Sequence, residues 1–230
     1  MQKTISLHNL LTMEQYTQET YHFDLSNDKI QTVHAFLNKD GASTAKEFAI
    51  KAYEYVRDNW PYYPYRFSLI NEDWRASELT THKSGHCIDK VIILIAILRA
   101  QKIPARLGLA KVKNHIAVDQ IVEKFGSDVL VPHGYIEIYI DNKWIKATPA
   151  FNKELCQLLN VKVLDFDGEN DSIFQEFDQT GKKAFMEYLE DYGTFNEVPL
   201  PYMFQLLQQH YPRIIESGIT LGGVLQLSKL

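Results

Sequence analysis

The hydrophobic and polar positions of residues 43–65 predict a helix that is followed by an aromatic loop. Ser43-Thr44 can cap a helix that runs to about Asn59, with apolar residues recurring along one face at helical spacing. Trp60-Pro61 ends this helix, because the residue before a proline is disfavoured in helical conformation. Tyr62-Tyr63-Pro64-Tyr65 then forms the loop.

A second helix is expected from just after Ser84-Gly85 to Ala100, before Ile103-Pro104. Its run from Val91 to Leu98 is apolar at every position, so the helix has no polar face there. Such a helix is expected to be buried on every side, at the centre of the fold.

The segment from His133 to Thr148 has the alternating pattern of a β-hairpin that turns at Asp141-Asn142. A two-residue loop there would pair Tyr139 with Trp144, Glu137 with Lys146 and Ile138 with Ile145. Moving the loop by one residue changes the partners but keeps His133 and Thr148 on one face. Helices followed by antiparallel strands predict an α+β fold.

Charge divides the chain unevenly. Residues 1–154 hold 19 Lys+Arg and 18 Asp+Glu, whereas residues 155–230 hold 5 and 11. Because no Gly/Ser-rich linker separates the two parts, we expect a single domain over 1–230 with an acidic, partly helical extension over 153–230. Its amphipathic stretches, Phe185 to Tyr192 and Tyr202 to Tyr211, are expected to pack on the core, either shaping a substrate cleft or capping a sheet edge.

Composition excludes several classes of protein. The 230 residues carry a net charge of −5 with a pI near 5.9, which disfavours a broad electrostatic interface with nucleic acid. The first eleven residues lack the apolar core of a secretory signal, and the longest apolar run is too short to span a bilayer. Two cysteines cannot form a disulfide framework and indicate a reducing compartment, so a cytoplasmic location is expected.

Cys87 is the candidate nucleophile. It lies in the first turn of the buried helix, where unpaired N–H groups and the helix dipole favour a thiolate. A cysteine nucleophile needs a base, and His133 on the predicted hairpin is the leading candidate. The alternative from position alone is that Cys87 is a small buried hydrophobic residue.

Three motifs together resemble the transglutaminase-like superfamily. Ser84-Gly85-His86-Cys87 opens an apolar helix that ends in Leu98 to Arg106, and His133-Gly134-Tyr135-Ile136-Glu137 is similar to the family's histidine motif. The lead-in helix with Tyr55 to Asn59 is also similar, and the resemblance covers about residues 42–152. It implies a papain-like core in which a central buried helix carries the nucleophile and packs on an antiparallel sheet that carries the base.

The resemblance also implies an activity. Members form a thioester from a glutamine carboxamide or a peptide bond and pass the acyl group to an amine, to water or to another nucleophile, without a metal or an organic cofactor. The expected partner is a protein or peptide carboxamide, or a small amide. Two alternatives stay open: a cysteine peptidase or amidase with water as acceptor, and a catalytically inactive peptide-binding or scaffold module.

A further motif of the family, which follows the histidine motif, departs from its usual form. In Trp144-Ile145-Lys146-Ala147-Thr148 a threonine stands where an aspartate normally orients the histidine. A hydroxyl can accept a hydrogen bond from an imidazole but brings no negative charge. Asn152 could supply an amide oxygen instead. The residue that orients the histidine is therefore Thr148, Asn152 or neither.

Other candidates concern the surroundings of Cys87. Its backbone N–H is the first expected oxyanion donor, and the indole N–H of Trp74 is a candidate for the second. His86 is expected at the rim of the cleft or in solvent. No metal site is expected, because Ser84-Gly85 interrupts the spacing from His82 to His86 and no Cys-x-x-Cys occurs. Cys156, in an apolar helical setting, is expected in the core.

Overall fold

The computed structural model describes residues 13–41, 44–115, 122–123, 126–173, 186–212, 220–221 and 224–226. The helices in these ranges are α2 (Asp28–Asn38), α3 (Ala45–Asn59), the 3-10 helix η1 (Asn71–Trp74), α4 (Ala76–Leu79), α5 (Cys87–Ala100), α7 (Lys153–Leu159) and α8 (Leu200–His210). The strands are β1 (Arg66–Ser68), β2 (Ala105–Asn114), β3 (Val129–Ile140), β4 (Lys143–Ala147), β5 (Met186–Phe195), β6 (Thr220–Leu221) and β7 (Val224–Gln226). The α+β fold predicted from the sequence is confirmed.

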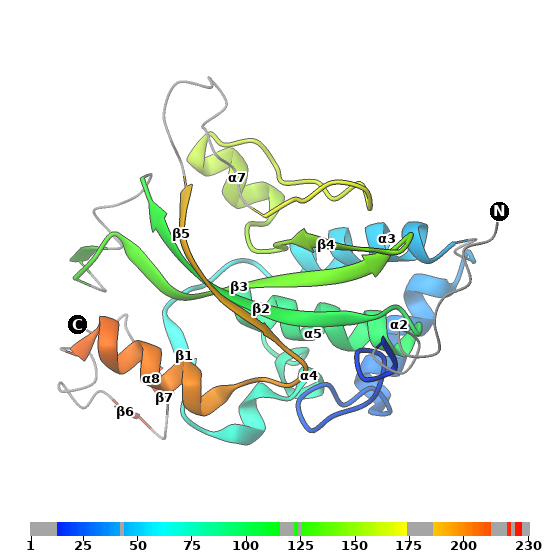
Figure 1. The fold of residues 1–230 in the computed structure, drawn as a ribbon, viewed down its shortest axis with the longest axis horizontal. Coiled ribbons are helices and arrows are strands. Elements are labelled where there is room, and N and C mark those ends of the chain that lie inside the picture. The colour runs from blue at the N-terminus through cyan, green and yellow to red at the C-terminus, as the bar shows by residue number, and fades with distance from the viewer. Residues whose placement is uncertain are drawn as a thin grey trace.

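An antiparallel sheet in the order β4-β3-β2-β5 curls in front of the helices (Figure 1). The β3–β4 register pairs Tyr139 with Trp144, Glu137 with Lys146 and Ile138 with Ile145, as predicted. The two loop residues have positive φ, 50° at Asp141 and 65° at Asn142. Asp and Asn tolerate this conformation, which matches the twist of a hairpin, so the local sequence sets the register.

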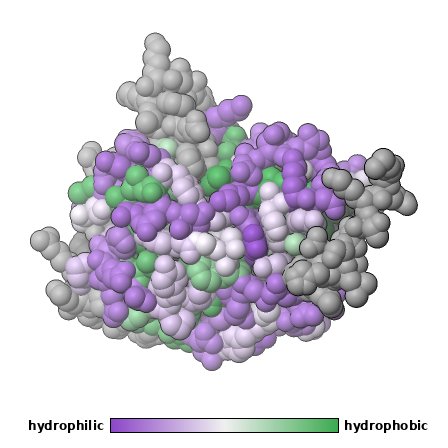
Figure 2. Space-filling model, in the orientation of Figure 1, coloured by the Kyte–Doolittle hydropathy of each residue, from purple (hydrophilic) through white to green (hydrophobic). Residues whose placement is uncertain are grey.

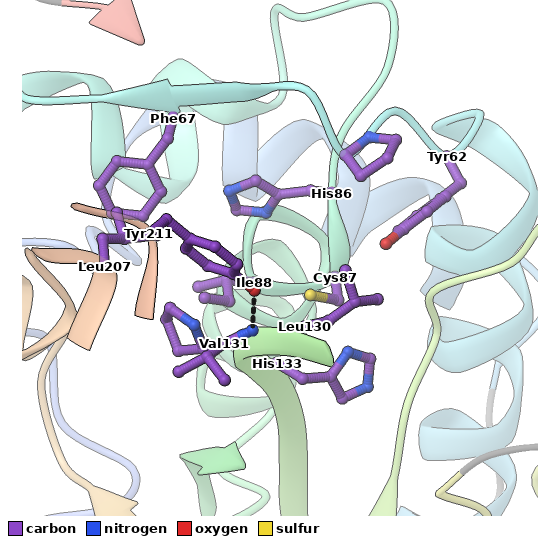
Figure 3. Close-up of a pocket in the computed structure, with 12 residues that line it drawn as sticks. Tyr62, Phe67, His86, Cys87, Ile88, Leu130, Val131, His133, Leu207 and Tyr211 are labelled. Carbon is purple, nitrogen blue, oxygen red and sulfur yellow. Dashed lines mark hydrogen bonds between the residues drawn. The ribbon is translucent and has the colours of Figure 1, made fainter. Parts of the chain in front are cut away.

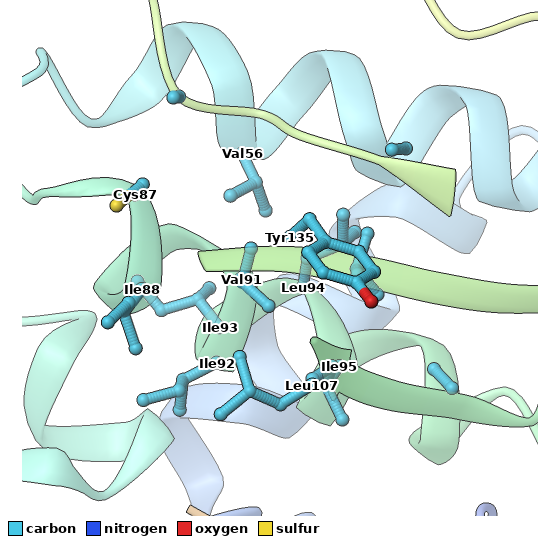
Figure 4. Close-up of a cluster of buried hydrophobic side chains, with 14 of the residues drawn as sticks. Val56, Cys87, Ile88, Val91, Ile92, Ile93, Leu94, Ile95, Leu107 and Tyr135 are labelled. Atoms are coloured by element: carbon cyan, nitrogen blue, oxygen red, sulfur yellow. The ribbon is translucent and has the colours of Figure 1, made fainter. Parts of the chain in front are cut away.

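Helix α5 is the centre of the fold. It packs against β2 and β3 on one side and against α2 and α3 on the other, and every residue from Cys87 to Arg99 is buried (Figure 4). Complete burial explains why the helix has no polar face. The prediction of a helix buried on every side is confirmed.

The C-terminal part of the chain adds a strand to this sheet as well as a helix. Met186–Phe195 forms β5, which pairs with the outer edge of β2, so this part of the first amphipathic stretch is a strand at the edge of the sheet. Pairing satisfies the backbone groups that β2 would otherwise leave open at the edge. Helix α8 then packs on β3, and β7 pairs with β1.

On the face shown in Figure 2, hydrophilic residues predominate and apolar residues occur in small separate areas. Among the described residues, no helix combines the length and the apolar character needed to cross a membrane.

Candidate active site

A capping box fixes the start of α5. His86 is the N-cap: its Nδ1 accepts a hydrogen bond of 3.1 Å from the Asp89 backbone N–H, and the Asp89 carboxylate accepts one of 3.0 Å from the His86 N–H. Reciprocal bonds of this kind define where a helix begins, and here they place Cys87 at its first position. His86 is 7% exposed and lines a cavity beside Cys87, which fits the expected place at the rim of a cleft and not the alternative in solvent. The spacing His86-x-x-Asp89 was the available sequence signal for the cap.

The first turn of α5 lies unusually close to β3. The backbone N–H of Gly134 donates a hydrogen bond of 3.3 Å to the Cys87 Sγ. A Cβ atom on Gly134 would lie 2.7 Å from Cγ1 and 3.0 Å from Cα of Ile88. Only glycine permits this approach, which places the sulfur next to the residue that follows His133.

Cys87 and His133 line the same cavity, whose volume is about 60 Å³. Figure 3 shows the sulfur at the N-terminal end of α5 and the His133 ring on β3, four residues after the strand begins at Val129. Most of the other cavity walls are aromatic or aliphatic: Tyr62, Phe67, Leu130, Val131, Leu207 and Tyr211. The cavity therefore joins the predicted nucleophile and the predicted base in apolar surroundings.

Burial controls the protonation of both groups. It raises the pKa of the Cys87 thiol to about 11, although the N–H groups of Gly134, Ile88 and Cys87 oppose the shift. The expected preference for a thiolate is therefore wrong, because loss of hydration outweighs the helix N-terminus. Burial, with the nearby His86, lowers the pKa of His133 to about 4. Near neutral pH the structure thus holds a neutral thiol and a neutral imidazole.

Thr148 and His133 border a second, smaller cavity of about 10 Å³. The backbone of Thr148 is fixed, since its N–H donates to Ser172 O and its carbonyl accepts from the Tyr53 hydroxyl. Within the described ranges, neither the Thr148 hydroxyl nor either ring nitrogen of His133 has a hydrogen-bond partner. The threonine therefore lies near the imidazole without orienting it through a direct bond.

Comparison with protein-family models matches residues 11–149, more than half of the chain, to the transglutaminase-like superfamily. The chain belongs to the transglutaminase-like superfamily. The matched region contains Cys87, His133 and Thr148, and the papain-like core inferred from the three motifs is confirmed. Membership supports a cysteine-dependent enzyme in general.

A solved structure is also similar to this superfamily member: a protein from Cytophaga hutchinsonii that is provisionally assigned as a cysteine protease. The two share 16% identity with a TM-score of 0.45, and the match covers 80% of this chain and 54% of the other. The present chain thus spans about half the length of that protein. A search of curated proteins found no match.

In this transglutaminase-like chain, Asn152 has a different role from orienting His133. Its Oδ1 accepts a 3.1 Å hydrogen bond from the Tyr62 backbone N–H, and its Nδ2 donates to Glu154 over 2.6 Å. Because both ends of the amide are engaged there, Asn152 holds the aromatic loop and does not orient His133. The possible role of Asn152 as the orienting residue is therefore wrong, and only the fold could show this.

Trp74 is not the second oxyanion donor. Its indole N–H donates a 3.0 Å hydrogen bond to Ser68 O, and its ring packs against Phe67 and His86. The side chain is 1% exposed, so it anchors the core beneath the loop.

The sequence pattern did not single out Lys90, which holds the loop that follows β4. Its Nζ is fully buried and donates to Arg57 O over 2.7 Å and to Ala150 O over 2.6 Å. Burial lowers its pKa to about 7. These bonds tie α5 to the segment that carries Thr148; a single lysine beside an otherwise apolar run was the only signal.

Tyr211, which directly follows α8, was likewise not recognised as part of this cavity. Its hydroxyl donates to Val129 O over 2.6 Å and accepts from the Val131 N–H over 2.8 Å. Both partners lie just before His133 on β3, and Figure 3 shows the bond to Val131. The acidic C-terminal part of the chain therefore supplies one wall of the cavity and holds the strand that carries the histidine.

Cys156 is completely buried and its Sγ contacts Phe151 O, as expected for a core residue. Both cysteines are free. In the part of the chain that the structure describes, no group of three or more His, Cys, Asp or Glu side chains is placed to hold a metal ion.

Proposed function

We propose that this protein transfers acyl groups or hydrolyses amides through a thioester at Cys87, with His133 as the base. The observation that carries the proposal is the cavity shared by the Cys87 sulfur and the His133 imidazole at the first turn of α5. Membership in the superfamily adds support, since the match includes Cys87 and the resemblance of its motif implies a cysteine nucleophile there. The proposed substrate is a protein or peptide carboxamide, or a small amide.

The reaction follows from the groups present. His133 takes the thiol proton as the Cys87 sulfur forms a bond to the carbonyl carbon, and the carbonyl electron pair moves to oxygen. Collapse of this tetrahedral intermediate breaks the C–N bond, and the His133 imidazolium protonates the departing amine. An amine or water then attacks the thioester, and its proton returns through His133 to restore the thiol.

The protonation of the pair bears on this route. The raised pKa of Cys87 and the lowered pKa of His133 describe a neutral thiol and a neutral imidazole, not a preformed ion pair. Proton transfer is therefore expected to accompany attack on a bound substrate. A substrate bound in the apolar cavity excludes water from it. The negative charge on the carbonyl oxygen and the positive charge on the imidazolium then develop together in these surroundings.

Amine transfer and hydrolysis differ only in the acceptor, and both routes release ammonia from a carboxamide. An added primary amine separates them: incorporation of the amine into the acyl donor supports transfer. Ammonia release without incorporation supports the amidase or peptidase alternative.

One observation favours a second candidate, a binding module that does not catalyse. The position that usually holds an aspartate carries Thr148, whose hydroxyl makes no bond to His133, so the imidazolium lacks a charged partner there. A peptide would then occupy the cavity beside an unreactive thiol. This module and the enzyme differ in whether Cys87 becomes acylated.

The test is acetylation by p-nitrophenyl acetate. The rate is measured from the release of p-nitrophenolate, and mass spectrometry of the Cys87 peptide identifies the adduct. We expect an acetyl adduct on Cys87 that Cys87→Ala abolishes and Cys156→Ala leaves unchanged. His133→Gln is expected to slow acylation by about 10²-fold or more, as for loss of a general base. Equal labelling of both cysteine variants, or no adduct on the native protein, would overturn the proposal.

Location is a separate proposal. Two free cysteines remain compatible with the reducing, cytoplasmic setting expected from the sequence.

A further inference from the structure

Tyr62 is held rigidly beside the Cys87 cavity by contacts on both sides of its backbone. The loop pairs with the segment before α5, through Tyr63 N–H to Gly85 O at 3.0 Å and Gly85 N–H to Pro61 O at 3.1 Å. Gly85 lies two residues before Cys87, so this pairing fixes the loop relative to the sulfur.

The side chain of Tyr62 is also fixed. Its backbone N–H donates to Asn152 Oδ1, and its ring packs edge-to-face on Phe151 with 4.8 Å between centroids. Its hydroxyl points into the cavity toward the sulfur (Figure 3). The fixed ring of Tyr62 therefore holds its hydroxyl in the cavity beside the sulfur, where a reacting carbonyl would bind.

The Tyr62 hydroxyl is available as a hydrogen-bond donor. It makes no hydrogen bond to another group within the described part of the chain, in contrast to its backbone. Burial raises the pKa of the phenol well above its usual value, with the nearby Cys87 contributing, so the hydroxyl keeps its proton throughout the working range. A neutral O–H can then donate to a developing oxyanion without leaving a charge behind.

The polar groups of two other aromatic side chains near the cavity already make hydrogen bonds elsewhere. The Trp74 indole N–H is bonded to Ser68 O, and the Tyr211 hydroxyl bridges Val129 and Val131. The Cys87 backbone N–H, at the first position of α5, has no intrahelical acceptor because of where it lies in the helix. Of these three aromatic side chains, Tyr62 is the one whose polar group faces the sulfur without a hydrogen bond to another described residue.

We propose that the Tyr62 hydroxyl is a catalytic residue: the second oxyanion donor, acting with the Cys87 backbone N–H on the acyl oxygen. This assignment rests on the proposed function. When the sulfur bonds to the carbonyl carbon, the carbonyl electron pair moves to oxygen and accepts hydrogen bonds from both donors. The phenol keeps its proton throughout, and collapse of the intermediate returns the pair to the carbonyl.

The test compares two reactions of the same sulfur. Iodoacetamide alkylates Cys87 by direct displacement at carbon and forms no oxyanion, whereas p-nitrophenyl acetate acylates it through a tetrahedral intermediate. We expect Tyr62→Phe to lower the acylation rate by about 10²-fold, the usual effect of losing one oxyanion donor, and to leave alkylation within about twofold of native. Tyr63→Phe, in the same loop but 39% exposed, is the control and is expected to change neither rate.

The outcomes separate the two proposals. If the native protein is acylated at Cys87 and Tyr62→Phe is acylated as fast, the proposed function stands and the role of Tyr62 is wrong. If Tyr62→Phe lowers both rates in equal proportion, the residue packs the cavity and does not stabilise an oxyanion. If the native protein is alkylated but never acylated at Cys87, the proposed function fails and the role of Tyr62 fails with it.

Discussion

The backbone N–H of Gly134 donates a hydrogen bond of 3.3 Å to the sulfur of Cys87. This bond joins the residue after the proposed base to the proposed nucleophile. It is possible because Gly134 has no side chain to keep Ile88 and the first turn of α5 at a distance. The mutual position of the sulfur and the imidazole therefore depends on one close backbone contact between a helix and a strand.

Gly134→Ala is expected to lower the free energy of unfolding by about 1–3 kcal/mol, because the new Cβ would overlap both the backbone and the side chain of Ile88. Urea denaturation measures this change. Gly108→Ala is the comparison, since the three atoms nearest its Cβ, at 2.1–2.4 Å, would all belong to the Tyr135 ring, which lies apart from Cys87 (Figure 4). Alkylation of Cys87 should change in Gly134→Ala alone; an unchanged urea midpoint for Gly134→Ala would contradict the close contact.

The pH dependence of alkylation reports the state of the thiol. With a pKa of about 11 for Cys87, the thiolate fraction rises about tenfold per pH unit from pH 6 to 10. We expect the iodoacetamide rate to rise over this whole range, measured in a Cys156→Ala background so that one thiol reacts. A plateau that begins near pH 7 would instead indicate a preformed thiolate–imidazolium pair.

His133 links stability to mild acid. Its folded pKa of about 4 lies below the value of about 6.5 expected in the unfolded chain. As the pH falls from about 6.5 to 4, His133 becomes protonated in the unfolded chain but stays neutral in the folded protein. The free energy of unfolding therefore decreases over this range. The loss is on the order of 2–3 kcal/mol. Urea denaturation at pH 7 and pH 4.5 should show a smaller loss for His133→Gln; equal losses in the two proteins would argue against a buried neutral ring.

Thr148→Asp tests the missing carboxylate. A negative charge beside the buried ring stabilises the imidazolium, so the pKa of His133 should rise and alkylation of Cys87 at pH 7 should accelerate by about tenfold. NMR titration of the ring gives the pKa directly. Thr148→Val, which keeps the shape without a charge, is the control and should behave as the native protein. The idea fails if the folded Asp variant reacts no faster than the Val variant.

Tyr211→Phe removes the hydroxyl that bridges Val129 and Val131. The variant leaves a buried N–H and a carbonyl unpaired and is expected to lose about 1–3 kcal/mol of stability. Hydrogen exchange at the Val131 amide should become faster. Tyr202→Phe, in α8 before Tyr211, provides the control, because within the described ranges its ring packs on Tyr192 and Phe195, away from Val129 and Val131. Equal exchange at Val131 in both variants would show that the bridge does not hold β3.

Local pattern was sufficient for the central elements of the fold. The apolar run from Val91 to Leu98 requires burial on all sides of α5, and the alternation before Asp141-Asn142 determines the β3–β4 register. Resemblance of the motifs then led to Cys87 and His133, which line one cavity. These features depend on residues near one another in the chain.

Remote partners decided the other features. Asn152 and Trp74 have side chains suited to the roles considered for them, but Tyr62 and Ser68 engage their polar atoms in the fold. Met186–Phe195 was recognised in the sequence only as part of an amphipathic stretch, and it is a strand in the fold, where the open edge of β2 offers hydrogen bonds.

By itself the sequence determined the helices α3 and α5 and the β3–β4 hairpin, because periodicity and turn residues act over a few positions. It also determined which sulfur and imidazole to consider. Only the tertiary structure decided the protonation of Cys87, because loss of hydration depends on everything packed around the sulfur and here exceeds the effect of the helix N-terminus. The same packing turned the Tyr62 hydroxyl, from a loop 25 residues before the cysteine, into the cavity.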